Sequence, residues 1–187
     1  VVATYKSNTF QKSLIFLASC GYAFPGTILA VGVVVFVGWL NDIFYFHMSY
    51  FIGGFLVLIF AYTLRFLAIG NGSIRSGVTR INPNLIDASR TMGRSFLTTM
   101  KKVILPLTYT NIFVGGILVF VDILKELPIT LLLRPFNFET LATYVYQYAS
   151  DEMLEESSFA ALIIVLAGLG PVIFISRTIK KYSSKTN

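Results

Sequence analysis

Two carboxylates four residues apart, Asp122 and Glu126, have a type and spacing that could support chemistry. On a helix this spacing places both side chains on one face, where paired carboxylates can transfer protons or bind a hard cation. No nucleophile with a nearby base accompanies them, and carboxylates at a membrane boundary are commonly just solvated. We therefore expect no catalytic residue. A passing contact with a metal ion remains an alternative to solvation or loop anchoring for this pair.

Other reactive groups are scarce. The single cysteine, Cys20, excludes an internal disulfide, and the single histidine, His47, leaves no His/Cys cluster for a structural metal site. The sequence also lacks the G-x-x-x-x-G-K-[ST] phosphate loop, so the chain itself should not hydrolyse ATP. We assign no metal ligand and expect no cofactor in this chain.

The segment LIDASRTMGRSFLTTMKKVILPLT, residues 85–108, concentrates basic residues between apolar regions. Asn84 or Asn82 can cap a helix beginning near Leu85, with Asp87 in its first turn, where the helix dipole favours an acid. Gly93 then permits a bend, and residues 95–102 can form a second short helix. Because such a basic helical pair is too polar to enter lipid, it either lies on an anionic membrane surface or docks into a partner.

Four long apolar segments surround these polar residues. Hydrophobic residues make up 55% of the 187 residues and charged residues only 13%, outside the balance of a typical soluble domain. A helix that crosses roughly 30 Å of hydrocarbon needs about 17 to 25 residues. We therefore predict an all-α membrane protein, a single transmembrane domain over residues 1–187, with spans at about 22–41, 49–68, 103–121 and 159–177.

The basic residues predict the orientation of these spans. Thirteen of the fifteen Lys and Arg residues fall on one side, counting Arg65 at the end of the second span, and eight of the nine acids fall on the other. The excess of Lys and Arg makes that side cytoplasmic, with both chain ends and the loop 82–102, and leaves 122–158 as a periplasmic loop. The net charge of +6 does not indicate a nucleic-acid partner, because no soluble face combines basic and aromatic residues.

Shorter elements are expected between the spans. Pro25 is tolerated in a first helical turn, so the first span should begin near Tyr22 and residues 4–20 should form an amphipathic connector. In the outer loop, Thr140–Ala149 can form a short interfacial helix and Leu127–Leu133 can re-enter the membrane. Glycines inside the spans indicate helix backbones that pack closely in lipid.

The basic loop also matches a known pattern. Asp87-Ala88-Ser89, three residues, Gly93, nine residues, Val103, one residue and Leu105-Pro106 resemble the EAA motif of membrane subunits of binding-protein-dependent ABC importers. That motif reads E-A-A, x3, G, x9, I, x, L-P, and the departures here are Asp for Glu, Ser for Ala and Val for Ile. Two further segments, 21–33 and 125–152, are similar to ferric-iron permeases of this superfamily.

The resemblance implies a fold and a coupling site. The fold would be a type I ABC importer transmembrane domain with a MetI-like core, four spans and a cytoplasmic coupling helix that inserts into a groove on an ATPase subunit. The residues that it assigns to this coupling site are Asp87, Ala88, Ser89, Arg90, Gly93 and Arg94.

The resemblance also implies a function: a permease of the bacterial inner membrane that translocates ferric iron. Its partners would be separate ABC ATPase subunits that bind ATP and Mg, a periplasmic ferric-iron-binding protein, a second permease half and membrane lipid. Because Val1 is not an initiator methionine and a first core helix is missing, we expect the chain to be the C-terminal half of something longer. Thiamine, a polyamine or an inorganic anion on the same scaffold remain alternative cargoes, and a membrane enzyme remains an alternative function.

Overall fold

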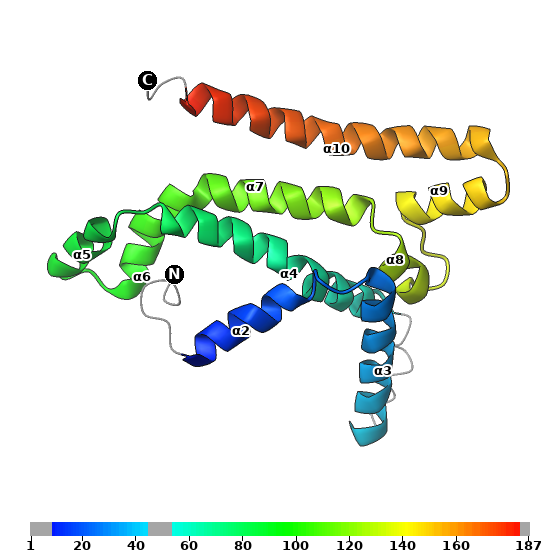
Figure 1. The fold of residues 1–187 in the computed structure, drawn as a ribbon, viewed down its shortest axis with the longest axis horizontal. Coiled ribbons are helices and arrows are strands. Elements are labelled where there is room, and N and C mark those ends of the chain that lie inside the picture. Colours follow the sequence, from blue (N-terminus) through cyan, green and yellow to red (C-terminus); the bar gives the residue numbers. More distant parts are fainter. Residues whose placement is uncertain (1–8, 45–53, 184–187) are drawn as a thin grey trace.

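The computed structural model describes residues 9–44 and 54–183, and within these ranges the chain consists of helices and turns without a strand (Figure 1). The all-α fold class is confirmed. The helices are α2 (Thr9–Cys20), α3 (Gly26–Phe44), α4 (Phe55–Thr79), α5 (Pro83–Thr91), α6 (Phe96–Thr99), the π-helix η2 (Met100–Ile104), α7 (Leu105–Leu124), α8 (Pro128–Leu133), α9 (Leu141–Ser150) and α10 (Leu154–Ser183).

Within the described residues, four helices are long and apolar enough to cross a membrane, as the sequence predicted. They are Gly26–Ile43, Phe55–Thr79, Phe96–Leu124 and Leu154–Ile173. The second span was expected to begin at residue 49, which lies outside the described residues, and its helix α4 continues to Thr79 instead of ending near residue 68. The fourth span is also longer than predicted, because α10 begins at Leu154 with Glu155 and Glu156 in its first turn, where acids favour a helix start.

The first span starts later than predicted. Pro25 ends the break after α2, and its carbonyl accepts the first helical hydrogen bond from Leu29 N–H at 3.1 Å, so α3 begins at Gly26. The break brings Gly21 so close to α4 that an added Cβ would lie 2.0 Å from the Leu64 carbonyl oxygen. Residues 9–20 of the expected connector form the separate helix α2, which packs on α4 (Figure 1).

α4 and α7 form an antiparallel pair at the centre of the molecule, with α10 along the other side of α7 (Figure 1). A Cβ added to Gly77 would meet Asn111 at 2.8 Å, and one added to Gly115 would meet Ser73 at 2.7 Å. The two contacts lie one helical turn apart in each helix and run in opposite directions, which defines the register. Small residues at both points allow this approach.

Most of the other span glycines do not confirm the expectation of close packing. An added Cβ would meet nothing within 4 Å at Gly32, Gly38, Gly116 or Gly170, and only an ordinary contact at Gly168. Close backbone contact within this chain is therefore confined to a few places, because most glycine positions face away from the neighbouring helices that the structure describes.

A small core joins α3, α4 and α8. The short helix α8 lies between the other two, while α3 runs crosswise to the α4–α7 pair (Figure 1). The buried residues of this core are Ala30, Val33 and Val37 of α3, Val57, Leu58 and Ala61 of α4, and Ile129 and Leu133 of α8.

The loop after α7 contains two helices. Leu127–Leu133 was expected as a re-entrant segment; six of its residues form α8, packed against protein. The predicted helix at Thr140–Ala149 is present as α9, one residue later. Thr140 is its N-cap, and its hydroxyl oxygen accepts a hydrogen bond from Thr143 N–H in a reciprocal capping box.

Candidate functional site

The segment that carries the EAA-like motif forms a bent helical pair at the end of the α4–α7 pair (Figure 1). We call residues 83–99, which contain α5 and α6, the elbow. Asn82 is the N-cap of α5, because its side-chain oxygen accepts a hydrogen bond from Asn84 N–H at 3.0 Å. Pro83 follows at the first helical position, where its missing N–H is not needed. Asp87 was expected in the first turn but is the fifth residue of α5, so the earlier cap places it one turn further on.

Gly93 makes the bend as predicted. Its φ of 72° lies in the left-handed region, where a residue with a Cβ is strained. Gly93 N–H donates to the Arg90 carbonyl at 3.0 Å, and Arg94 N–H donates to the Ser89 carbonyl at 3.2 Å. These two bonds form a Schellman cap, which satisfies carbonyls at the end of α5 and turns the chain toward α6.

A buried pair of hydroxyls joins α5 and α6, the first and second arms of the elbow. The Ser89 and Thr99 side-chain oxygens lie 2.9 Å apart, and both residues are almost fully buried. Beneath them a small apolar cluster joins the elbow to the long helices: Val78 of α4, Ile81 just after α4, Ile104 of η2, and the half-buried Ile86 and Met100. The elbow is therefore packed against the end of α4 and against η2, which leads into α7.

The second arm runs directly into the third span. Residues 95–102 were predicted to form a separate short helix, but α6 passes through η2 into α7 without a break. Pro106 supplies the reason for the wide π turn. It has no N–H for the carbonyl four residues earlier, so the turn before it opens, and Leu105 N–H bonds to the Met100 carbonyl instead.

The outer face of the elbow is both apolar and charged. Leu85 is 50% exposed and Met92 73%, while Leu97 on the second arm is 68% exposed. Of the six residues predicted for the coupling site, Ser89 is buried, and Asp87, Ala88, Arg90, Gly93 and Arg94 are exposed. A rigid exposed face of this kind, apolar with a charged rim, is typical of a surface that docks into a protein groove.

Asp122 and Glu126 do not form a joint site. α7 ends at Leu124, so the two carboxylates do not share a helix face as predicted. Asp122 pairs with Lys125 at 2.8 Å, and this contact raises the pKa of the Lys125 ammonium. Glu126 pairs instead with Arg65 of α4 at 3.2 Å. Each carboxylate is thus already neutralised by a basic partner.

The Arg65–Glu126 contact corrects the predicted charge distribution. Arg65 was counted at the basic end of the second span, on the side opposite Glu126, yet their side chains touch. The reason is the length of α4, which continues fourteen residues beyond Arg65 to Thr79, or about 21 Å at 1.5 Å per residue. Arg65 therefore lies well inside the helix, away from its basic end.

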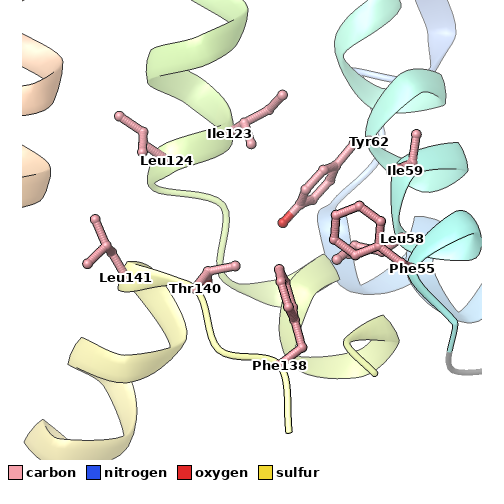
Figure 2. Close-up of a pocket in the computed structure, with 9 residues that line it drawn as sticks. All are labelled: Phe55, Leu58, Ile59, Tyr62, Ile123, Leu124, Phe138, Thr140 and Leu141. Atoms are coloured by element: carbon pink, nitrogen blue, oxygen red, sulfur yellow. The ribbon is translucent and has the colours of Figure 1, made fainter. Parts of the chain in front are cut away.

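The described residues contain no group of three or more His, Cys, Asp or Glu side chains that could hold a metal ion. They do contain a mainly apolar pocket of about 220 Å³ between α4, the end of α7 and the start of α9. Figure 2 shows Tyr62 and Phe138 directed into this space from α4 and from the loop before α9. The pocket offers aromatic and aliphatic surface and no cluster of hard ligands.

Sequence reasoning missed two contacts. Thr99 was not recognised as the partner of Ser89, because ten residues and a bend separate them. Arg65 was not recognised as the partner of Glu126, although an arginine and a glutamate within apolar regions signal that each needs an opposite charge nearby.

Comparison with known proteins agrees with this architecture. The family model described as "Binding-protein-dependent transport system inner membrane component" matches residues 1–183. The chain is 27% identical over 165 residues to the Fe(3+)-transport system permease protein FbpB 2 of Haemophilus influenzae, covering 88% of this chain and 30% of that protein. It is 25% identical over 185 residues to the spermidine/putrescine transport system permease protein PotC homolog of Mycoplasma genitalium, covering 94% of this chain and 58% of that protein.

The chain thus spans about a third to somewhat over half of the length of these two relatives. The family match covers nearly all of the chain, and it agrees with four apolar helices and a basic bent segment between the second and the third. The chain belongs to the family of binding-protein-dependent transport system inner membrane components.

Proposed function

We propose that this chain is a permease subunit of an ATP-driven importer and that its elbow couples it to an ATPase subunit. The observation that carries the proposal is the elbow itself: a Schellman-capped bend at Gly93, braced by Ser89 and Thr99, at the joined ends of two membrane-spanning helices. A partner that pushes on this elbow moves α4 and α7 together, because the buried cluster below it contains residues from the end of α4 and from η2, which continues directly into α7.

Docking explains the elbow better than attachment to lipid does. A surface helix held by anionic lipid would turn its apolar side toward the bilayer and its cations toward the headgroups. Here Ile86 and Ser89 of α5 face the protein, while Leu85, Met92 and Leu97 are exposed together with the arginines. Exposed apolar side chains beside Arg90 and Arg94 suit a protein groove with acidic edges.

The proposed assembly contains more than this chain. Two ATPase subunits supply ATP hydrolysis, a second permease half completes the pore, and a periplasmic binding protein delivers the cargo. We place the elbow and its basic residues in the cytoplasm and the loop with α8 and α9 on the periplasmic side, following the excess of Lys and Arg. Exposed apolar residues along α3, such as Val31, Val35 and Trp39, would then face lipid or the second half.

We propose ferric iron as the cargo. Support comes from the similarity to a permease whose name states Fe(3+) transport. A polyamine is the second candidate, because the other relative is named for spermidine and putrescine transport. Growth on ferric iron, or on spermidine in a polyamine auxotroph, distinguishes the two cargoes when a strain that lacks this permease is complemented with the intact gene.

Gly93→Val tests the coupling role. A Cβ at Gly93 meets open space, so the effect of this change arises from the φ of 72° alone. A strained backbone costs about 1 to 3 kcal/mol, which corresponds to roughly five- to 150-fold weaker docking if the strain is felt in the docked state. We expect normal membrane insertion, loss of ATPase co-purification and loss of cargo uptake. Gly93→Asn is the matched control. It should retain more ATPase co-purification and more cargo uptake than Gly93→Val, because Asn adopts positive φ more readily than Val.

Asp87→Lys tests the exposed docking face separately from the bend. Asp87 lies beyond the first turn of α5, so this charge reversal should disturb the helix little and the docked surface more. We expect a milder loss of ATPase co-purification than in Gly93→Val. If Gly93→Val binds its ATPase and transports normally, the elbow is not the coupling element.

A further inference from the structure

Arg65, inside the second span, forms an ion pair with Glu126, two residues beyond the end of α7, and the elbow does not use this pair. Arg65 Nε lies 3.2 Å from Glu126 Oε2, and the two side chains are only 18% and 8% exposed. Arg65 Nη1 also donates a hydrogen bond at 3.0 Å to the carbonyl of Phe24, in the break between α2 and α3. Charged groups inside a membrane are rare because of their desolvation cost, and they usually mark functional positions.

The pair holds the beginning of α8. Glu126 Oε1 accepts a hydrogen bond from Ile129 N–H at 3.4 Å, and the Glu126 carbonyl accepts one from the Thr130 hydroxyl at 2.7 Å. Thr130 also shares a hydrogen bond with Tyr62, one helical turn before Arg65 on α4. Two polar side chains of α4, Tyr62 and Arg65, thus anchor the first turn of this six-residue helix.

α8 occupies a central place in the core. Ile129 and Thr130 are fully buried and Leu133 is 2% exposed, and α8 fills the space between α3 and α4. No side chain fits between α3 and the ion pair, because a Cβ at Gly26 would lie 2.8 Å from Glu126 Oε1 and 3.2 Å from Arg65 Nη1. Tyr62, which anchors α8 through Thr130, also lines the 220 Å³ pocket shown in Figure 2. Empty space therefore borders one side of the Tyr62–Thr130 contact.

We propose that Arg65 and Glu126 are positioning residues for transport: their ion pair keeps α8 seated between α3 and α4, and α8 leaves this seat during the transport cycle when the pair separates. The inference rests on the proposed transport function. The polar anchors of α8 are concentrated in its first turn, so loss of the ion pair leaves the Tyr62–Thr130 hydrogen bond and the apolar packing of Ile129 and Leu133 alone to hold the helix on α4. Packed cores of this kind switch between discrete arrangements and do not deform continuously.

A buried cysteine reports whether α8 is seated. In a Cys20→Ala background, Leu133→Cys places a thiol at a position that is 2% exposed, and Leu132→Cys, at a position that is 51% exposed, serves as the matched control. The intact permease in its complex with the ATPase subunits is treated with N-ethylmaleimide in membrane vesicles. Each reporter is placed in four backgrounds. In the first, Arg65 and Glu126 are unaltered; the second carries Glu126→Gln, the third Arg65→Gln, and the fourth exchanges the two charges (Arg65→Glu with Glu126→Arg).

We expect Glu126→Gln and Arg65→Gln to raise the labelling rate of the Leu133→Cys reporter by at least about tenfold, because removing one partner leaves the other charge buried and unpaired. The Leu132→Cys reporter should label at the same rate in every variant. Cargo uptake should fall in both single variants while ATPase co-purification stays unchanged. Exchange of the two charges should restore slow labelling and uptake only in part, because Glu at position 65 cannot donate to the Phe24 carbonyl and Arg at position 126 cannot accept from Ile129 N–H. A general loss of stability would produce no recovery at all.

Unchanged labelling in Glu126→Gln overturns the proposal, and so does increased labelling with normal uptake. If Glu126→Gln does not reach the membrane, Arg65→Lys provides the test. Lysine keeps the charge but lacks the planar guanidinium that reaches both Glu126 and the Phe24 carbonyl, so labelling and uptake should be intermediate. The proposed function fails by a different result, the absence of ATPase co-purification with the unaltered permease, so the two failures are distinguishable.

Discussion

At the scale of single residues, the Ser89–Thr99 hydroxyl pair determines whether the elbow keeps its shape. Both side chains are buried, and their oxygens are 2.9 Å apart. Ser89→Ala or Thr99→Val alone leaves one buried hydroxyl without its partner, which costs about 1 to 3 kcal/mol, whereas removing both can be nearly neutral. We predict that each single variant weakens ATPase co-purification and that the double variant recovers most of it.

A double-mutant cycle on ATPase binding affinity measures this coupling. Thr98→Val is the control, because Thr98 lies on the neighbouring helical position and pairs with the exposed Ser95. Additive losses in the double variant would show that the two hydroxyls act independently, against our expectation.

At the scale of elements, the π-helix η2 links the elbow to the third span. Pro106 has no backbone N–H to donate to the carbonyl four residues earlier, as an ordinary helical residue would. The helix widens at this point, and the wide turn is η2. Pro106→Ala restores this donor, so the turn should tighten toward α-helix and rotate α6 relative to α7. We predict that ATP-driven uptake falls severalfold while the protein is still inserted.

Leu107→Ala is the matched control for Pro106→Ala, since Leu107 is the next residue and is 53% exposed. Uptake and ATP hydrolysis measured on the same vesicles give the number of cargo ions moved per ATP. A Pro106→Ala variant with the same ratio as the unaltered permease would mean that the π turn plays no part in transmission.

At the scale of the whole molecule, the elbow and the α8–α9 loop lie at opposite ends of α7, which predicts opposite sides of the membrane (Figure 1). In a Cys20→Ala background, Phe136→Cys should react with an impermeant maleimide from the periplasmic side, and Ser76→Cys should not. Phe136 suits this test because it is fully exposed. Reverse labelling would contradict the proposed orientation.

Local patterns predicted most of the elements, but not the end of α4 or the continuity of α6, η2 and α7. Length and lack of charge predicted four spanning helices, and a cap, a glycine and a proline in sequence predicted the bend at Gly93. The repeated spacing of Leu141, Tyr144 and Tyr148 predicted α9 to within a residue. These features depend on residues within one or two turns of each other, so they can be recognised without knowledge of the fold.

Only the tertiary structure decided which distant residues meet. The sequence placed Arg65 and Glu126 on opposite sides of the membrane, whereas the antiparallel register of α4 and α7 brings them into contact. In the same way the bend at Gly93 brings Ser89 to Thr99, and the packing of α8 between α3 and α4 turns an expected re-entrant loop into part of the core. The physical reason is that burial of a polar group requires a partner, and folding, not spacing along the chain, supplies that partner.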